Sequence, residues 1–354
     1  MTGPRRAARA RRGGALLATA LLLAGCAGDA PAPDRATGRA GSAPASSEDW
    51  IARTDDDALF TVDCPFSHRA PDDPIVHPGQ PGASHSHEFF GSTATDASST
   101  GATLRGTETT CEDGDDTAAY WVPTLSVDGV PVAPSFVRAY YRARPGADVR
   151  AVTSPPLGLA MIAGDPDAVP GDHDHDGREG GGGATATTAP VPHEHGDAGM
   201  EHEHGGASTT TSPSTTGPVG AAGDADPPVA GWGCGLRPRH LAEVPPDDCT
   251  DRSPLTLQLR FPDCWDGENL DSPDHRAHVA RSVDGACPAT HPVLMTELQL
   301  SISWPVTGAA ATTATLASGS TAGAHGDFLN GWEPDALAGH VDLCIHAKAN
   351  CTIG

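Results

Sequence analysis

Apolar and polar residues alternate along two segments in the last third of the chain. Residues 255–261 place Leu or Phe at every second position, and residues 297–304 do the same with Leu, Ile and Trp. Successive side chains of a strand leave opposite faces, so each segment is predicted to be a strand with one buried and one solvent-facing side. Residues 118–127, 135–143 and 157–163 are further strand candidates.

Turn residues separate these segments. The chain contains 42 Gly and 33 Pro, and its sequence shows no long apolar repeat of 3.6 residues. Many short strands broken by turns predict an all-β fold. We expect a single β-sandwich or jelly-roll-like domain with long loops, stapled by disulfides.

Two stretches are too poor in apolar residues to form a core. Residues 26–47 are mainly Ala, Gly, Pro and Ser, which is typical of a flexible tether. Residues 165–228 contain no Phe, Trp or Tyr and are interpreted as a disordered, His-rich insertion. We therefore expect one β-rich domain over residues 48–354, interrupted by that insertion.

The first 25 residues predict export. Five arginines lie among residues 5–12, residues 15–23 are apolar, and Leu-Ala-Gly leads to Cys26. A membrane-spanning helix needs about 20 apolar residues, so this run is too short. The pattern is typical of a bacterial lipoprotein signal peptide, residues 1–25, with Cys26 as the lipidation site that anchors the chain to the membrane, facing the extracellular side. An ordinary secretory signal is the alternative, and both export the chain.

Charge and cysteine content add two constraints. The chain has 46 acidic and 22 basic residues, a formal charge of −24, which would repel phosphate backbones and argues against a nucleic-acid partner. Eight cysteines besides Cys26 suit disulfides in an exported chain. Pairing sequence neighbours gives Cys64–Cys111, Cys234–Cys249, Cys264–Cys287 and Cys344–Cys351.

The histidine content is the most unusual feature of the sequence. Six of the 17 lie in the insertion, interleaved with Asp and Glu, and imidazole with carboxylate suits Zn, Cu or Ni. This group is a candidate metal scavenger, and a solvated linker is the alternative reading. Its members are His173, His175, His193, His195, His202 and His204.

A second histidine group lies in the predicted domain. His85 and His87 are two residues apart, so on a strand both imidazoles leave the same face. Four Asp and two His follow within residues 263–278, and His325 and Asp327 come later. The candidate catalytic residues are His85, His87, Glu88, Asp263, Asp266, Asp274, His275, His278, His325 and Asp327.

Three roles compete for these residues. His85, His87 and one of His275, His278 or His325 would form a three-nitrogen metal site, with Zn, Cu and Ca as the candidate metals. Alternatively, two of the carboxylates would serve glycoside hydrolysis, or a histidine or tyrosine would abstract a proton in a lyase. The third role is structural, with Asp and His side chains satisfying turn backbones.

Several motifs together resemble one protein family. The segments SHSHEFFG, AYWVPTL, GLAMIAGD, FPDCWDG, LDSPDHRAH and HGDF resemble those of a family of secreted proteins known as a domain of unknown function (DUF1996). The resemblance covers about residues 57–351 apart from the insertion and implies one domain. Members of this family sometimes occur beside carbohydrate-binding modules, which suggests a polysaccharide context by association.

The sequence thus supports two main functional hypotheses. The first is a lipid-anchored domain that binds or processes a polysaccharide through the His/Asp-rich loop residues, with Trp265 and Trp332 as candidates for stacking on sugar rings. The second is a non-catalytic surface protein that binds divalent metal through the insertion. A structural or adhesion module is a third reading, and whether the protein is an enzyme stays open.

Overall fold

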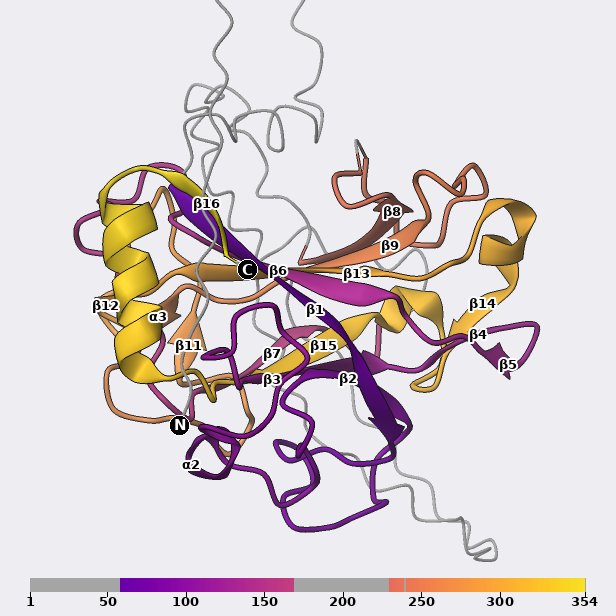
Figure 1. Cartoon of the computed structure of the whole chain (residues 1–354), viewed down its shortest axis with the longest axis horizontal. Coiled ribbons are helices and arrows are strands. Elements are labelled where there is room, and N and C mark those ends of the chain that lie inside the picture. Colours follow the sequence, from indigo (N-terminus) through magenta and orange to yellow (C-terminus); the bar gives the residue numbers. More distant parts are fainter. Residues whose placement is uncertain (1–57, 169–228, 239, 354) are drawn as a thin grey trace, which may run out of the picture. The chain divides into compact units, whose positions relative to one another are not determined.

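The computed structural model describes residues 58–168, 229–238 and 240–353 (Figure 1). The predicted leader, the tether, Cys26 and the six insertion histidines lie outside these residues. Within them, ten strands form one large sheet in the order β7-β15-β3-β2-β1-β6-β13-β9-β8, with β16 beside β1. Its strands are β1 (Leu59–Ala70), β2 (His87–Gly91), β3 (Ala119–Pro123), β6 (Phe136–Arg142), β7 (Ala160–Gly164), β8 (Ala230–Cys234), β9 (Leu255–Arg260), β13 (Glu297–Ser303), β15 (His325–Leu329) and β16 (Asn350–Ile353).

Smaller elements decorate this sheet. One three-stranded sheet contains β11 (Val279–Ala280), β10 (Cys264–Trp265) and β12 (Val293–Leu294), and another contains β14 (Ala314–Leu316), β4 (Leu125–Val127) and β5 (Val130–Pro131). The helical segments are α2 (Gly101–Leu104), η2 (Gly308–Thr313), η3 (Thr321–Gly323), α3 (Pro334–His340) and η4 (Val341–His346). In the described part of the chain, no helix combines the length and apolarity that a membrane crossing requires.

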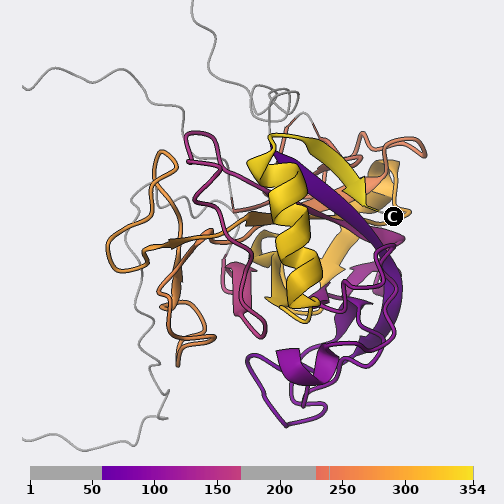
Figure 2. The same cartoon turned by 60° about the vertical axis from the view of Figure 1, so that its left-hand side comes forward.

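The long strand β1 joins the two halves of the large sheet. Its first part pairs with β6 and, in parallel, with β16. Its last part pairs with β2, and the register of that pairing shifts between Phe66 and His68. The remaining pairs in the sheet are antiparallel. Figures 1 and 2 show β2, β3, β15 and β7 on one side and β6, β13, β9 and β8 on the other. The all-β, sandwich-like prediction is confirmed.

The core lies between these two halves. Phe328 of β15 faces Phe261, which directly follows β9, with ring centroids 6.4 Å apart. Gly326, two residues before Phe328, leaves room for the buried side chain of Leu259. Strands from both sides of residues 169–228 therefore contribute to one core.

The predicted strands are present, but their polar sides are not wetted as expected. Every residue of β9 and of β13 is buried. The polar positions instead bond to one another across strands: Arg260 pairs with Glu297 at 2.5 Å, and Gln258 donates to Ser301 Oγ at 3.2 Å. The expectation of a solvent-facing side is wrong for both strands, because their polar groups are satisfied internally.

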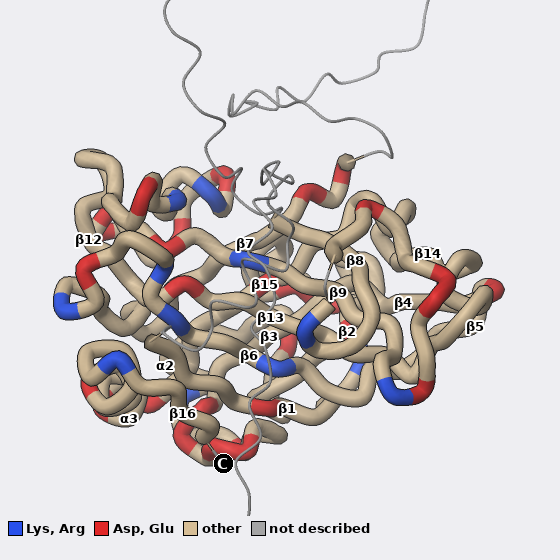
Figure 3. Tube along the Cα trace, turned by 90° about the horizontal axis from the view of Figure 1, so that it is seen from above, with Lys and Arg blue, Asp and Glu red and all other residues tan. Residues whose placement is uncertain are grey.

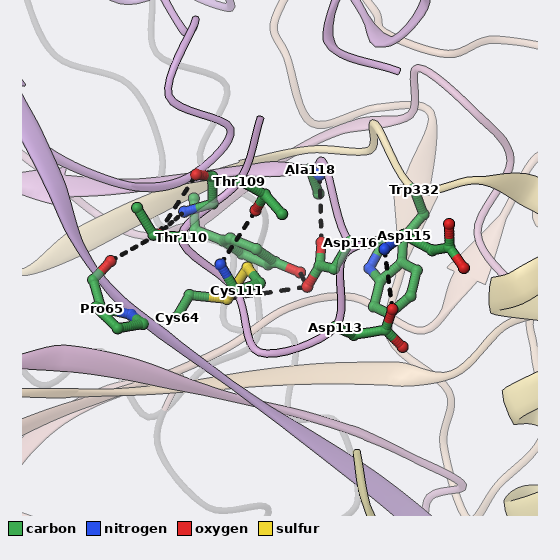
Figure 4. Close-up of a disulfide and its surroundings, with 12 residues drawn as sticks. Cys64, Pro65, Thr109, Thr110, Cys111, Asp113, Asp115, Asp116, Ala118 and Trp332 are labelled. Carbon is green, nitrogen blue, oxygen red and sulfur yellow. Dashed lines mark hydrogen bonds between the residues drawn. A yellow bond between two sulfur atoms is a disulfide. The ribbon is translucent and has the colours of Figure 1, made fainter. Parts of the chain in front are cut away.

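Disulfides staple the loops to this framework. All four pairs expected from sequence neighbours are present: Cys64–Cys111, Cys234–Cys249, Cys264–Cys287 and Cys344–Cys351. The first lies beside a buried polar network (Figure 4), in which the hydroxyl of Tyr120 donates to Asp116 at 2.8 Å. Disulfides are typical of exported proteins, so this finding agrees with the expected export.

Candidate functional site

Strand β15 presents two polar side chains on the face that points away from the core. Gly326 and Phe328 face inward, toward β9, as described above. Side chains alternate along a strand, so His325 and Asp327 face the other way. Both are nevertheless buried, at 5% and 1% exposure. Buried polar groups on an outer face require a cover and partners there.

Strand β2 adds a histidine to the same outer face. Phe90 belongs to the main core, whereas Phe89 belongs to a second, outer apolar cluster, and His87 shares the face of Phe89. Phe89 is register partner to Trp121 of β3, which is register partner to Asp327. The outer face of β2, β3 and β15 therefore carries His87, Asp327 and His325 close to one another.

The loop over residues 71–86 covers this face. Ile75 of the loop belongs to the outer apolar cluster together with Phe89 and Trp121. Asp73 precedes Ile75 and is buried. His85, at the end of the loop, is half-buried beside His87.

Three imidazoles converge at this point, and we call them the three-histidine cluster: His85, His87 and His325. One ring nitrogen of each lies within 4.8 Å of those of the other two. Ring centroids are 4.3 Å apart for His85 and His87, 5.4 Å for His85 and His325, and 6.4 Å for His87 and His325.

Backbone carbonyls orient two of these rings. Nδ1 of His87 lies 2.9 Å from the carbonyl oxygen of Asp72, and Nδ1 of His325 lies 2.9 Å from that of Gly323. A carbonyl only accepts hydrogen bonds, so each Nδ1 carries the proton and each Nε2 presents a lone pair. Nε2 of His87 and Nε2 of His85 are buried without a hydrogen-bond partner among the described residues.

Two carboxyl groups border the cluster. Asp73, His87 and Asp327 form a second group whose potential ligand atoms lie within 4.8 Å of one another. Asp73 Oδ1 accepts hydrogen bonds from the backbone N–H groups of Ile75 and Val76, both at 2.9 Å. Oδ2 of Asp327 is buried and has no hydrogen-bond partner in the described part of the chain.

Burial sets the protonation of the site. It is the main reason that the pKa of His87 falls to about 3 and that of His85 to about 4, and the charge of a neighbouring histidine lowers each further. Burial also lowers the pKa of His325 and raises those of Asp73 and Asp327. At neutral pH the imidazoles are therefore neutral, which is the form that binds metal ions.

The other predicted site residues lie outside the cluster. Glu88 directly follows His87 on β2, so its side chain leaves the opposite face of the strand. There it forms an ion pair with Arg69 at 2.5 Å. Asp263 is buried and accepts hydrogen bonds from the backbone and hydroxyl of Ser282. Asp266 accepts from the turn that follows it. These three carboxylates satisfy local donors and do not meet the histidines.

The loop from Asp271 to His278 forms a separate network. His275 Nδ1 lies 2.9 Å from Asp271, and Asp274 accepts three hydrogen bonds within the loop, which lower its pKa to about 2. His278 lies between Ser272 and the carbonyl oxygen of Ala160. Among the three candidate partners for His85 and His87, the structure brings only His325 to them.

Two residues change the sequence-based picture. Asp73 was not among the predicted site residues, although it stands between two prolines shortly before the HxH motif, in the Pro-Asp-Asp-Pro segment.

Trp332 is fully buried, and its indole donates to the hydroxyl of Tyr141 at 3.0 Å. Trp332 therefore cannot stack on a sugar ring, and that expectation is wrong.

A hollow of about 320 Å³ adjoins the site on the same face. Leu329 and Ala160, which are register partners on β15 and β7, form part of its lining, as does Ile75 of the covering loop. Leu329 follows Asp327 by two residues, which is roughly 7 Å along a strand. The remaining lining residues are Pro74, Ser99, Thr100, Gly101, Ala102, Leu157, Gly158, Leu270 and Asp271.

Comparison with known proteins gives one match. No curated protein and no solved structure matches the chain. The model of the family described as "Domain of unknown function (DUF1996)" matches residues 73–332. The match begins at Asp73 and includes the three-histidine cluster and Asp327. The chain therefore belongs to the DUF1996 family.

Proposed function

We propose that the three-histidine cluster binds one divalent transition-metal ion, and that the domain uses this centre on a polysaccharide outside the cytoplasm. One observation carries the proposal: three neutral imidazoles converge on one point, and two of them have buried Nε2 atoms with no hydrogen-bond partner among the described residues. A buried polar atom without a partner destabilises the fold by about 1–3 kcal/mol. A bound metal ion would remove that penalty.

The surroundings of the rings support a metal centre over a structural role. Histidine ligands of metal ions commonly donate their second N–H to a carbonyl or carboxylate, which fixes the ring and its tautomer. His87 and His325 both do so, to Asp72 and Gly323. Purely structural histidines would use both nitrogens for hydrogen bonds, as His278 does in this domain.

The ligand set selects among metals. Imidazole nitrogens suit Zn²⁺ and Cu²⁺, whereas Ca²⁺ requires six to eight oxygen ligands. Three nitrogens leave a coordination position open, as in catalytic zinc sites, whereas structural zinc sites use four protein ligands. We therefore propose Zn²⁺ or Cu²⁺ in a centre of the catalytic kind, and we no longer favour Ca²⁺ for these residues.

The carboxyl groups of Asp73 and Asp327 supply acid–base and hydrogen-bonding capacity. Both lie beside His87, so either can bond a water molecule or a substrate hydroxyl next to the cluster. The adjoining hollow gives a substrate room along the same face. Polysaccharide is the proposed substrate class because the motifs resemble a family whose members occur beside carbohydrate-binding modules.

Metal content of the purified protein tests the proposal. The full chain is prepared without a His tag, with the six insertion histidines replaced by Ser, and its Zn and Cu are measured by mass spectrometry. We expect about one ion per chain. His87→Ala and His85→Ala should each reduce the metal content severely, while His291→Ala, at a half-buried histidine outside the cluster, should not. Near-UV circular dichroism confirms folding of each variant.

A full complement of metal in folded His87→Ala and His85→Ala, or no metal in the parent, would contradict the proposal. The same experiment addresses metal capture by the insertion, whose six histidines lie outside the described residues. That alternative predicts that the natural chain binds several more ions than the Ser-substituted chain.

A further inference from the structure

Arg276 lies at the rim of the three-histidine cluster. Its guanidinium donates a hydrogen bond from Nη2 to the carbonyl oxygen of Gly164 at 2.9 Å. Gly164 is the register partner of His325, and a β-carbon on Gly164 would stand 2.7 Å from His325 Cα. The guanidinium is therefore bonded to the residue of β7 that lies opposite the proposed metal ligand His325.

The loop that carries Arg276 is built to hold it there. The backbone N–H of Arg276 donates to Ser272 Oγ and Asp274 Oδ1, both at 3.1 Å. His275, directly before it, has a φ of 58°, the left-handed conformation that turns the chain sharply. His278 ties the end of the loop to β7 through the carbonyl oxygen of Ala160 at 2.7 Å.

Among the described residues, no carboxylate forms an ion pair with Arg276. Arg69, Arg105 and Arg138 each form an ion pair with a carboxylate. By contrast, no carboxylate of the described residues lies within 4.0 Å of the Arg276 guanidinium, which is exposed. A guanidinium has five N–H donors, and one of those of Arg276 bonds to the carbonyl oxygen of Gly164 while the residue is exposed.

This positive charge stands out on an acidic protein. The whole chain carries a formal charge of −24, and acidic residues recur along most loops of the domain (Figure 3). A divalent metal ion in the three-histidine cluster and the nearby guanidinium of Arg276 would together attract an anion.

We propose that Arg276 binds an oxyanion group of the substrate, so that the domain selects an acidic polysaccharide over a neutral one. A guanidinium presents parallel N–H donors that match the two oxygens of a carboxylate, and it binds sulfate esters through the same donors. Arg276 is thus a specificity-determining residue rather than a metal ligand. This inference rests on the metal centre proposed above.

Calorimetric titration of the zinc-loaded full chain, with the six insertion histidines replaced by Ser, tests the inference. The probes are oligogalacturonate for carboxylate, a sulfated carrageenan oligosaccharide for sulfate ester, and maltohexaose as the neutral control. We expect one of the acidic probes to bind and maltohexaose not to bind. Arg276→Gln should weaken binding of the acidic probe about tenfold or more, and Arg276→Lys should weaken it less. Arg252→Gln, at an exposed arginine elsewhere, serves as the matched control.

The metal content of each preparation separates the possible failures. Zinc bound normally, with equal affinity for acidic and neutral probes or with no effect of Arg276→Gln, would overturn the role of Arg276 and leave the metal centre intact. Absence of zinc from the parent protein would overturn the metal centre and this inference with it. The acidic probe that binds identifies the oxyanion as carboxylate or sulfate.

Discussion

Gly326 of β15 lies directly against Leu259 of β9, where the two halves of the large sheet meet. A β-carbon at position 326 would stand 2.4 Å from Leu259 Cδ1, 3.0 Å from Val122 Cγ1 and 3.2 Å from the carbonyl oxygen of Trp121. This contact fixes which side chains of β15 face the core. Because residue 326 faces the core, residues 325 and 327 must face the outer side, where the histidine cluster forms.

We therefore expect Gly326→Ala to destabilise the domain. The added methyl group has no free volume, and overpacking a core costs about 1–3 kcal/mol. Urea unfolding followed by tryptophan fluorescence measures the loss. Gly339→Ala is the control, because nothing lies within 4 Å of a β-carbon there and Gly339 is within α3. That change should leave stability unchanged or raise it; equal effects of the two substitutions would contradict the packing argument.

A second prediction concerns Glu297, which is fully buried among arginines. It pairs with Arg142 at 2.9 Å and with Arg260 at 2.5 Å, and Arg144 and Arg281 lie 3.9 Å away. Removing one partner of a buried ion pair leaves uncompensated charge and typically costs about 3–5 kcal/mol. Glu297→Gln should lose stability of that order in urea unfolding at pH 7. Glu333→Gln, at the exposed pair with Arg105, should lose far less.

The same residue predicts a pH dependence. Burial acts to raise the pKa of Glu297, but the neighbouring arginines outweigh it, and the pKa falls below its ordinary value of 4.5. The unfolded chain therefore binds this proton first as the pH falls. The stabilising contribution of Glu297 is complete above about pH 4.5 and is lost as the pH drops toward the lower folded-state pKa. Unfolding free energies measured from pH 6 to 3 should fall more steeply for the natural protein than for Glu297→Gln; parallel curves would contradict this.

The sequence predicted several of the strands but not the long strand β1 or the site strand β15, and it did not predict what covers each strand. The alternation in 255–261 and 297–304 predicted β9 and β13 correctly. Their polar faces are buried because the partners of Glu297 come from the end of β6, from β9 and from a loop. A pairwise arrangement of that kind depends on strand order, which local periodicity does not contain.

The candidate site shows the same limit. The spacing of His85 and His87 predicted two imidazoles on one face, and they are in contact. Choosing His325 as their partner, over His275 or His278, required knowing that β3 lies between β2 and β15. Asp73 reaches the site through a loop that folds over the sheet, and a loop path has no periodic signal.

The disulfides offer a fourth prediction, based on loop length. Cys64 and Cys111 are 47 residues apart, whereas Cys344 and Cys351 are 7 apart. In the chain-entropy description, a cross-link stabilises by about 4 kcal/mol for the longer loop and about 2.4 kcal/mol for the shorter. Replacing both cysteines of a pair by Ala should therefore cost more stability for the first pair. Guanidinium unfolding of the two double variants gives the comparison, and the reverse order would contradict it.

Cys26 lies outside the described residues, and its lipidation is still a prediction from the sequence. Cell fractionation with immunoblotting checks it in a bacterial expression host that lipidates exported proteins. The natural chain should sediment with membranes and dissolve in detergent, whereas Cys26→Ser should lose the anchor and move to the soluble extracytoplasmic fraction. Recovery of both forms in that soluble fraction would favour an ordinary secretory signal.

The buried polar network beside the first disulfide supplies the last prediction. Trp332 donates to the hydroxyl of Tyr141 at 3.0 Å, that hydroxyl lies 2.7 Å from the hydroxyl of Tyr120, and Tyr120 donates to Asp116 at 2.8 Å. Burial raises the pKa of Asp116 well above its ordinary value, and the Tyr120 hydrogen bond opposes that rise. Tyr120→Phe preserves the ring but breaks the chain of hydrogen bonds in its middle.

We expect Tyr120→Phe to lower the unfolding free energy by about 1–3 kcal/mol, because a buried carboxyl group and a buried hydroxyl each lose a partner. Tyr140→Phe removes a hydroxyl that is not part of this network and should cost less. Thermal unfolding by near-UV circular dichroism distinguishes the two variants. Equal stability of Tyr120→Phe and the natural protein would mean that the network contributes no net stability, and that its role is to fix the position of the loop carrying Asp116.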